Sequence, residues 1–400
     1  MNFPCRLLFH PLSAVVVALI AMTSPARPIA QTTLLPVMSE LDNPRGLAFG
    51  PDGGLYVAEA GRGGAGPCRP VGMQTFCYGP TGAVSRLLEG VQQRIVQGLP
   101  SIAQAGTGTR ATGPHDIAML GVGAAYVTIG LEANPAVRNL FPEFAGFGRV
   151  VKINPEGDWR FVADISAYEA AHNPDGRVED ADADPSTPPT PVYDSNPYGV
   201  LAKPGGLLVT DAGANTLFAV EPNGRFSLLA VFHSRGTVPI RPSFAPAGSE
   251  QFTDAVPTTV IAGPDGAYYV AELTGVPFVE GTANIYRVVP AETPQLFLIE
   301  DACIAGFKMI IDMDFDAEGN LYVLQHSTGL TGGTSPGKVV RIAPDRSQAD
   351  ACAQYRAGTR SDVVSGLPRP TSLVVGPDGA LYISRLGSTA GLGEVVRVER

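Results

Sequence analysis

The chain has 400 residues, of which 47 are glycine and 36 are proline, and only 16% are charged while 44% are apolar. This many helix-breaking residues exclude a mainly helical protein or a coiled coil, and the apolar fraction excludes a disordered chain. The formal net charge of -10 makes nucleic acid an unsuitable partner, because an acidic surface repels phosphate groups. These numbers favour an all-β protein of many short strands joined by tight turns.

Residues 1–30 have the features of a secretory signal peptide. Arg6 precedes a mostly apolar run at 12–22, and small residues follow, with cleavage expected after Ala26 or Ala30. A run of 11 residues is shorter than the about 20 that span a bilayer, so we expect no membrane span in the mature chain. An uncleaved anchor is the alternative. We expect residues 31–400 to be one domain, monomeric, and periplasmic or secreted.

Four cysteines remain after the loss of Cys5 with the signal peptide. An even number in an exported chain indicates disulfide bonds. Cys68 and Cys77 are the favoured pair because they lie close together in a loop rich in glycine and proline. Cys303 with Cys352 follows by elimination. The spacing contains no C-x-x-C pair, so we expect no zinc site.

A short unit repeats along the chain. The tetrapeptide Gly-Pro-Asp-Gly occurs at 50–53, 263–266 and 376–379, each time just before an apolar segment with tyrosine at its centre. Three looser copies precede Tyr126, Leu208 and Tyr322. Proline sets the first corner of a turn and the final glycine accepts a positive φ, so each copy predicts a β-hairpin.

Each hairpin is followed by further strands. A third strand alternates apolar and basic residues at 84–87, 150–153, 339–342 and 395–398, where the basic residues are expected to lie on a solvated face. A fourth strand is predicted at 94–97, 160–163, 226–232, 295–299 and 363–366.

The count of strands predicts a closed ring. Six units have only five fourth strands, and the chain ends directly after the third strand of its last unit. The extended apolar segment 34–41 precedes the first unit, and its pairing with the last unit leaves no exposed sheet edge. We therefore predict a six-bladed β-propeller closed by its N-terminal strand. A series of β-sandwich pairs is the alternative, but it does not explain the split blade.

Propeller geometry predicts where a site lies. The residues that lead into each first strand and those that follow each second strand lie at the same end of the ring. They supply polar side chains from positions far apart in sequence: Arg45, Glu59, His115, Asp116, Glu132, Tyr198, Asp211, Glu272, Gln325, His326 and Arg385. Two interpretations stay open: these groups form ion pairs that cap the channel, or they form a pocket for a small molecule.

Two hypotheses concern chemistry at this end. Glu59, Asp211 and Glu272 are candidate oxygen ligands for a hard cation such as Ca²⁺. The sequence contains neither a Gly-x-Ser-x-Gly elbow nor an HExxH motif, which argues against the commonest hydrolases and zinc proteases.

Several motifs resemble a known family. The segment 43–77, the block Gly-Leu-Pro-Ser at 98–101, Gly-Pro-His-Asp-Ile at 113–117, and the segments 173–176 and 194–198 resemble the ScyD/ScyE family of secreted propellers, with NHL-like repeats of the strictosidine-synthase type. The resemblance covers nearly all of the mature chain and implies fold and export. It assigns no catalytic residues, but it gives weight to Glu59, His115, Asp116 and Tyr198.

The sequence therefore predicts an exported propeller whose channel mouth binds an unknown small molecule or protein. One alternative is a metal-assisted hydrolase resembling a lactonase, with Ca²⁺ polarising a carbonyl, His115 as base and Asp116 as its orienting group. The other is a protein-interaction scaffold that uses the 68–77 loop as its contact.

Overall fold

The computed structural model describes residues 32–121, 124–177, 190–232, 254–289, 297–298, 302–329 and 335–399. Six antiparallel sheets form a ring, as the sequence predicts. The predicted signal peptide, residues 1–30, lies outside the described residues. Of the described helices, none is long and apolar enough to cross a membrane.

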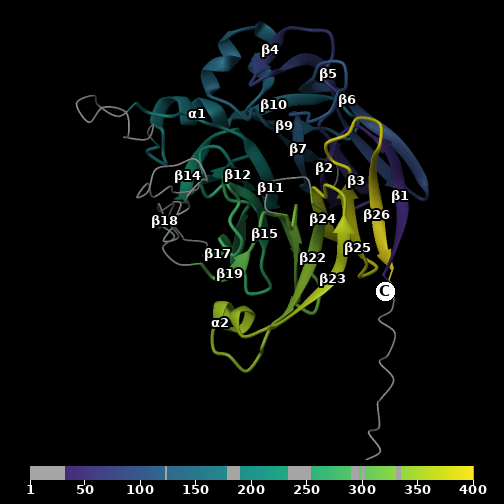
Figure 1. The fold of residues 1–400 in the computed structure, drawn as a ribbon, viewed down its shortest axis with the longest axis vertical. Coiled ribbons are helices and arrows are strands. Elements are labelled where there is room, and N and C mark those ends of the chain that lie inside the picture. The colour runs from purple at the N-terminus through teal and green to yellow at the C-terminus, as the bar shows by residue number, and fades with distance from the viewer. Residues whose placement is uncertain are drawn as a thin grey trace, which may run out of the picture. The chain divides into compact units, whose positions relative to one another are not determined.

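The first three blades follow one another along the chain (Figure 1). Blade 1 contains β2 (Pro44–Phe49), β3 (Leu55–Glu59), β5 (Gln74–Leu88) and β6 (Val91–Gln104), with the short β4 (Cys68–Val71) paired to β5. Blade 2 contains β7 (Pro114–Met119), β8 (Ala125–Ile129), β9 (Arg149–Ile153) and β10 (Trp159–Asp164). Blade 3 contains β11 (Pro197–Lys203), β12 (Gly206–Asp211), β13 (Thr216–Val220) and β14 (Phe226–Val231), with β18 (Phe297–Leu298) beside β14.

The last three blades complete the ring. Blade 4 contains β15 (Pro257–Ala262), β16 (Tyr268–Glu272), β17 (Ala283–Val288) and β19 (Ile304–Phe307). Blade 5 contains β20 (Ile310–Phe315), β21 (Leu321–Gln325), β22 (Gly337–Ala343) and β23 (Thr359–Leu367). Blade 6 contains β24 (Ser372–Val375), β25 (Leu381–Arg385), β26 (Gly393–Glu399) and β1 (Thr33–Leu41).

The N-terminal strand closes the ring as predicted. β1 pairs antiparallel with β26, from Thr33 opposite Glu399 to Leu41 opposite Gly393, and Figure 1 shows the two strands side by side. Sheet pairing therefore joins the beginning of the described chain to its end.

One predicted strand of blade 4 is wrong. The sequence placed the fourth strand at 295–299, but Phe297–Leu298 pairs in parallel with β14 of blade 3. The fourth strand is β19, which pairs with β17. Both segments are short and apolar, so local pattern alone does not separate them.

Within the described ranges, four short helices lie between strands. They are η1 (Pro135–Asn139), η2 (Pro142–Gly146), α1 (Ile165–His172) and α2 (Ala351–Arg356). Asp164 caps α1 and Asp350 caps α2 by accepting a backbone N–H, so the loops of blades 2 and 5 contain helical turns that the sequence analysis did not predict.

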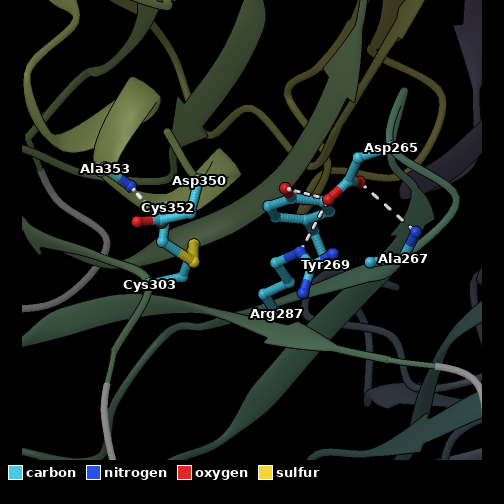
Figure 2. Close-up of a disulfide and its surroundings, with 8 residues drawn as sticks. All are labelled: Asp265, Ala267, Tyr269, Arg287, Cys303, Asp350, Cys352 and Ala353. Atoms are coloured by element: carbon cyan, nitrogen blue, oxygen red, sulfur yellow. Dashed lines mark hydrogen bonds and ion pairs between the residues drawn. A yellow bond between two sulfur atoms is a disulfide. The ribbon is translucent and has the colours of Figure 1, made fainter. Parts of the chain in front are cut away.

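The repeated turns are held by one recurrent contact. In blade 4, Asp265 accepts hydrogen bonds from the hydroxyl of Tyr269 at 3.4 Å and from Arg287 at 2.7 Å (Figure 2). Gly266 has a φ of +78°, the left-handed conformation that the turn requires. Arg287 lies on the third strand, so a basic residue of that strand helps to hold the turn in blade 4.

The core lies between neighbouring blades. The second strand of each blade is almost wholly buried, as in β3 and β21, because a neighbouring blade covers each of its faces. In the described chain, six apolar clusters fill the six blade interfaces. This packing explains why the second strands are continuous apolar runs.

Both predicted disulfide bonds are present. Cys68 and Cys77 join β4 to β5, and Cys303 joins Cys352 at the start of α2 (Figure 2). The 68–77 segment, expected to be a loop, is a β-hairpin that extends beyond blade 1.

Candidate functional site

Antiparallel pairing brings the predicted site residues to one end of the ring. Pro44 pairs with Glu59, Pro197 with Asp211, and Pro257 with Glu272, so the start of each first strand lies beside the end of its second strand. The Gly-Pro-Asp-Gly turns lie at the opposite end of the same strands.

A cavity of about 460 Å³ lies at this end. Every blade or its loops contribute to its lining: Arg45, Arg69, Val71, Phe76, Ile102, Arg110, Thr112, Glu132, Tyr198, Leu273, Phe278, Met309, Ile311, His326, Thr371 and Ser388. We call this cavity the mouth pocket. Of the eleven residues predicted from the sequence, Arg45, Glu132, Tyr198 and His326 line it.

Arg45 is held by backbone carbonyls. Its guanidinium donates hydrogen bonds to the carbonyl of Gly387 and, at 2.9 Å, to that of Ala111. Nε of Arg45 is buried and has no partner among the described residues. The ion-pair interpretation therefore does not describe Arg45, because its partners are peptide carbonyl oxygens.

His326 lines the pocket, and one of its ring nitrogens is hydrogen-bonded to the backbone. Nδ1 lies 2.8 Å from the carbonyl of Pro370, and since a carbonyl only accepts, Nδ1 carries the proton. Burial lowers the pKa of His326, and the charges of Arg45 and Arg369 lower it further, against the opposing effect of the Pro370 carbonyl. At neutral pH its Nε2 is therefore an unprotonated acceptor.

His115 is absent from the pocket lining. It is buried, its ring centroid is 4.7 Å from that of Tyr198, and its Nε2 is 3.8 Å from Oε1 of Glu132. Burial and then the charge of Arg45 lower the pKa of His115 to about 3, against the opposing effect of the Pro197 backbone. The ring is therefore neutral across the physiological range.

Asp116 does not orient His115. Its carboxylate accepts the backbone N–H of Val200 at 2.8 Å and that of Ile117 at 2.8 Å, which links blade 2 to blade 3. Asp312 links blade 5 to blade 6 in the same way, through Leu373. Burial raises the pKa of Asp116 well above its usual value, and the nearby charge of Asp312 raises it further. The prediction that Asp116 orients His115 as a base is thus wrong, because the carboxylate of Asp116 accepts hydrogen bonds from backbone N–H groups instead.

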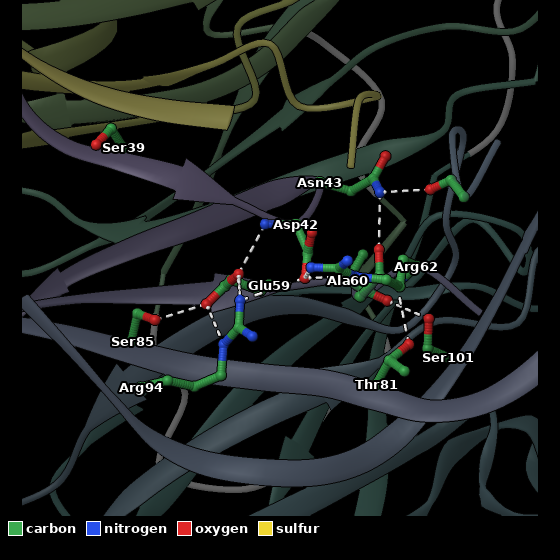
Figure 3. Close-up of polar contacts among 12 residues, drawn as sticks. Ser39, Asp42, Asn43, Glu59, Ala60, Arg62, Thr81, Ser85, Arg94 and Ser101 are labelled. Atoms are coloured by element: carbon green, nitrogen blue, oxygen red, sulfur yellow. Dashed lines mark hydrogen bonds and ion pairs between the residues drawn. The ribbon is translucent and has the colours of Figure 1, made fainter. Parts of the chain in front are cut away.

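Glu59 belongs to a buried ion network (Figure 3). Its carboxylate accepts hydrogen bonds from Arg94 at 2.5 Å, from Ser85 at 2.6 Å and from the backbone of Asp42 at 2.7 Å. Arg94 and Arg62 also pair with Asp42. These contacts give Glu59 a structural role within blade 1.

Asp211 is occupied by protein donors. It accepts hydrogen bonds from the hydroxyl of Ser195 and from the backbone N–H groups of Asn196, Gly213 and Ala214. Burial raises the pKa of Asp211, and these bonds oppose that rise.

Glu272 and the last two candidates lie outside the pocket lining. Glu272 accepts hydrogen bonds from Asn284 at 2.6 Å and Tyr286 at 3.2 Å, and burial raises its pKa to about 8. Gln325 is buried at the end of β21. Arg385 pairs with Glu394 at 2.7 Å, as the ion-pair interpretation predicts.

The three carboxylates predicted to hold Ca²⁺ do not form one ligand set. Glu59, Asp211 and Glu272 each accept hydrogen bonds from side chains of their own blade or the segments beside it, which leaves them poorly suited to a cation. Within the described ranges, no group of three or more His, Cys, Asp or Glu side chains is arranged to hold a metal ion. Calcium binding stays a prediction, and Glu59, Asp211 and Glu272 are not arranged as its ligands.

Sequence reasoning missed most of the pocket's walls. Arg69, Val71 and Phe76 belong to the β4–β5 hairpin, and Arg110 follows β6. Arg110 donates to Gln74 at 2.7 Å and lies over the ring of Phe76, 5.7 Å from its centroid. The disulfide-linked pair of cysteines was the available signal, since it marks a hairpin stiff enough to form a wall.

The fold is similar to that of a protein of known structure. A protein described as an oxidoreductase (glucose dehydrogenase) from Thermus thermophilus is 16% identical, with a TM-score of 0.52 over 92% of this chain and 100% of its own. A glucose dehydrogenase is 12% identical with a TM-score of 0.49, covering 92% and 99% of the two chains. A streptogramin B lyase is 10% identical with a TM-score of 0.43, covering 92% and 97%.

Comparison by sequence gives no relative. No family model matches the chain, and no curated protein matches it. At identities this low the structural likeness shows the fold alone. Together with the six antiparallel sheets, it identifies the chain as a six-bladed β-propeller.

Proposed function

We propose that this protein is an exported propeller of the ScyD/ScyE type that binds a small molecule at its channel mouth. The observation that carries the proposal is the mouth pocket, which draws polar and apolar side chains from all six blades around about 460 Å³. Pockets of this size with a few polar groups over apolar walls are typical small-molecule sites. Two disulfide bonds are compatible with export to an oxidising compartment.

The hydrolase alternative stays a prediction. His326 suits the role of base better than His115, because His326 lines the pocket and has an unprotonated Nε2, whereas His115 is buried and does not line it. The scaffold alternative also stays a prediction, and it would use the same hairpin that forms a pocket wall.

Blocking the pocket tests the proposal. Val71 is 40% exposed on the hairpin wall, so Val71→Trp is expected to fill the mouth without disturbing the core. Val91→Trp is the matched control, since Val91 is 66% exposed at the far end of the β5–β6 hairpin. A set of small acids, amines and neutral aromatic compounds is measured by ligand-observed NMR and by thermal shift.

Compounds that bind the unaltered protein are expected to bind Val91→Trp equally and Val71→Trp at least about tenfold more weakly, because the indole occupies their volume. Binding that Val71→Trp leaves unchanged, or no binding by any compound, would overturn the proposal.

A further inference from the structure

The two sides of the mouth pocket differ in charge. Blade 1 and the segments attached to it contribute three arginines, Arg45, Arg69 and Arg110. Blades 4 and 5 lie across the ring from blade 1 and contribute mainly apolar side chains: Leu273, Phe278, Met309 and Ile311. A molecule in the pocket therefore meets positive charge at one end and apolar surface at the other.

In the part of the chain that the structure describes, Arg45 and Arg110 form no ion pair with an acid. Arg45 donates to two peptide carbonyls, and Arg110 donates to the amide oxygen of Gln74. Neither of these partners carries a charge. By contrast, Arg385 at the same end of the ring is paired with Glu394.

One carboxylate, that of Glu132, belongs to the described lining. The side chain of Glu132 is 49% exposed, and its Oε1 lies 3.8 Å from Nε2 of His115. Burial lowers the pKa of Arg69, and the charge of Glu132 opposes that effect. Water screens this half-exposed charge, and one carboxylate offsets at most one of the three guanidinium charges, so the lining keeps an excess of positive charge.

The local field agrees with this arrangement. The charge of Arg45 adds to burial in lowering the pKa of both His115 and His326. A net charge of -10 for the whole chain makes this positive region an exception on an acidic molecule. Such contrast attracts an anion to the pocket and away from the remaining surface.

We propose that the ligand of the mouth pocket is an organic acid whose anionic group binds the guanidinium of Arg45 and whose apolar body contacts blades 4 and 5. The inference rests on the proposed small-molecule function. A guanidinium has five N–H bonds, and the two carbonyls use two of them, which leaves donors for a carboxylate. The neutral Nε2 of His326 accepts a hydrogen bond from a hydroxyl or amide of the same ligand.

Three matched probes test the charge. They are 4-phenylbutyrate, its neutral amide 4-phenylbutyramide and the cation 4-phenylbutylamine, measured at pH 7 by calorimetry, with inorganic phosphate as an anion lacking an apolar body. The acid is expected to bind at least about tenfold more tightly than the amide, as a charge-assisted hydrogen bond requires. Its affinity is also expected to fall as salt is raised, because mobile ions screen the arginines.

Two substitutions localise the effect. Arg45→Met removes the charge and keeps an unbranched apolar side chain, and it is expected to abolish the preference for the acid. Arg385→Met removes an arginine from the same end of the ring, one that already has an acidic partner, and it is expected to keep the preference. Should Arg45→Met not fold, Arg69→Gln replaces it, because Arg69 lies on the β4–β5 hairpin outside the blades. Arg69→Gln is expected to weaken acid binding several-fold.

The outcomes separate the two proposals. Equal binding of acid and amide that Val71→Trp removes would overturn the acid inference and leave small-molecule binding intact. Binding of phosphate as tight as that of the acid would overturn the role of the apolar wall. Failure of all four probes would overturn the inference together with the proposed site, and loss of preference in Arg385→Met would overturn the assignment to Arg45.

Discussion

Buried carboxyl groups within the blades disfavour their own charge. Burial raises the pKa of Glu272 to about 8 and that of Asp314 to about 7, even though each accepts hydrogen bonds that oppose the rise. The cause is desolvation, since a carboxylate removed from water loses more solvation than two or three hydrogen bonds restore. These residues therefore make the stability of the protein depend on pH.

Glu272→Gln is expected to flatten that dependence. The folded-state pKa of about 8 lies above the usual 4.5, so the stability that Glu272 contributes is complete below about pH 4.5 and is lost as pH rises through 8. Gln has the same shape and no charge. At pH 9 the free energy of unfolding of the variant is therefore expected to exceed that of the unaltered protein by on the order of 1–3 kcal/mol. Urea unfolding from pH 5 to 9 measures this.

The exposed Glu280 supplies the control for this experiment, because Glu280→Gln is expected to follow the unaltered protein at every pH. A Glu272→Gln protein whose stability declines with pH as steeply as the control would contradict the assignment.

The β4–β5 hairpin contributes side chains to the mouth pocket, and its strand β4 is not one of the four main strands of blade 1. It extends beyond blade 1, carries Arg69, Val71 and Phe76 to the pocket, and is closed by the Cys68–Cys77 disulfide. The second disulfide, Cys303–Cys352, lies at the other end of the blades and joins segments 49 residues apart. The two bonds therefore have different consequences.

Removing each disulfide is expected to separate binding from stability. In the chain-entropy description, the 49-residue separation is worth about 4 kcal/mol and the 9-residue separation about 2.6 kcal/mol. C303S/C352S is thus expected to melt at a lower temperature than C68S/C77S. Only C68S/C77S is expected to weaken ligand binding, because it loosens a wall of the pocket. Thermal melts and calorimetry with 4-phenylbutyrate measure both effects, and equal affinities in the two variants would exclude the hairpin from the site.

At the scale of the whole molecule, one strand determines whether the ring is closed. β1 is the first described strand, and it completes blade 6, which contains the last described strand. Its apolar side chains are buried between blades 6 and 1. Met38 and Leu41 are 2% and 0% exposed there, next to Leu47 and Val57 of blade 1.

Leu41→Ala is therefore expected to destabilise the whole ring. A buried Leu→Ala change costs about 2–5 kcal/mol through lost contacts and a cavity. Leu35→Ala on the same strand is the control, since Leu35 is 46% exposed and its loss is expected to cost less than about 1 kcal/mol. The two free energies of unfolding come from urea denaturation, and similar losses for both would show that β1 is not part of the cooperative core.

The ring was predictable because its signals are local and repeated. Turns such as 263–266 require glycine at a positive φ whatever surrounds them. The last unit lacks a fourth strand and the segment before the first unit is an extra strand, so pairing these two completes the last sheet. The fourth strand of blade 4 marks the limit of that reasoning. Two short apolar segments follow one another there, and local pattern does not show that the first pairs with β14 and the second with β17.

The sequence by itself determined the fold, both disulfide bonds and the end of the ring at which polar side chains gather. Only the tertiary structure decided which of those side chains face the pocket. Asp116, Asp211 and Glu59 have the same chemistry as any ligand-binding carboxylate, but backbone N–H groups and Arg94 bind them first. Arg69 and Phe76 lie outside the repeat and reach the pocket only because the hairpin folds over it. The physical reason is that turn geometry depends on a few adjacent residues, whereas the partner of a polar group depends on what the fold brings within hydrogen-bonding distance.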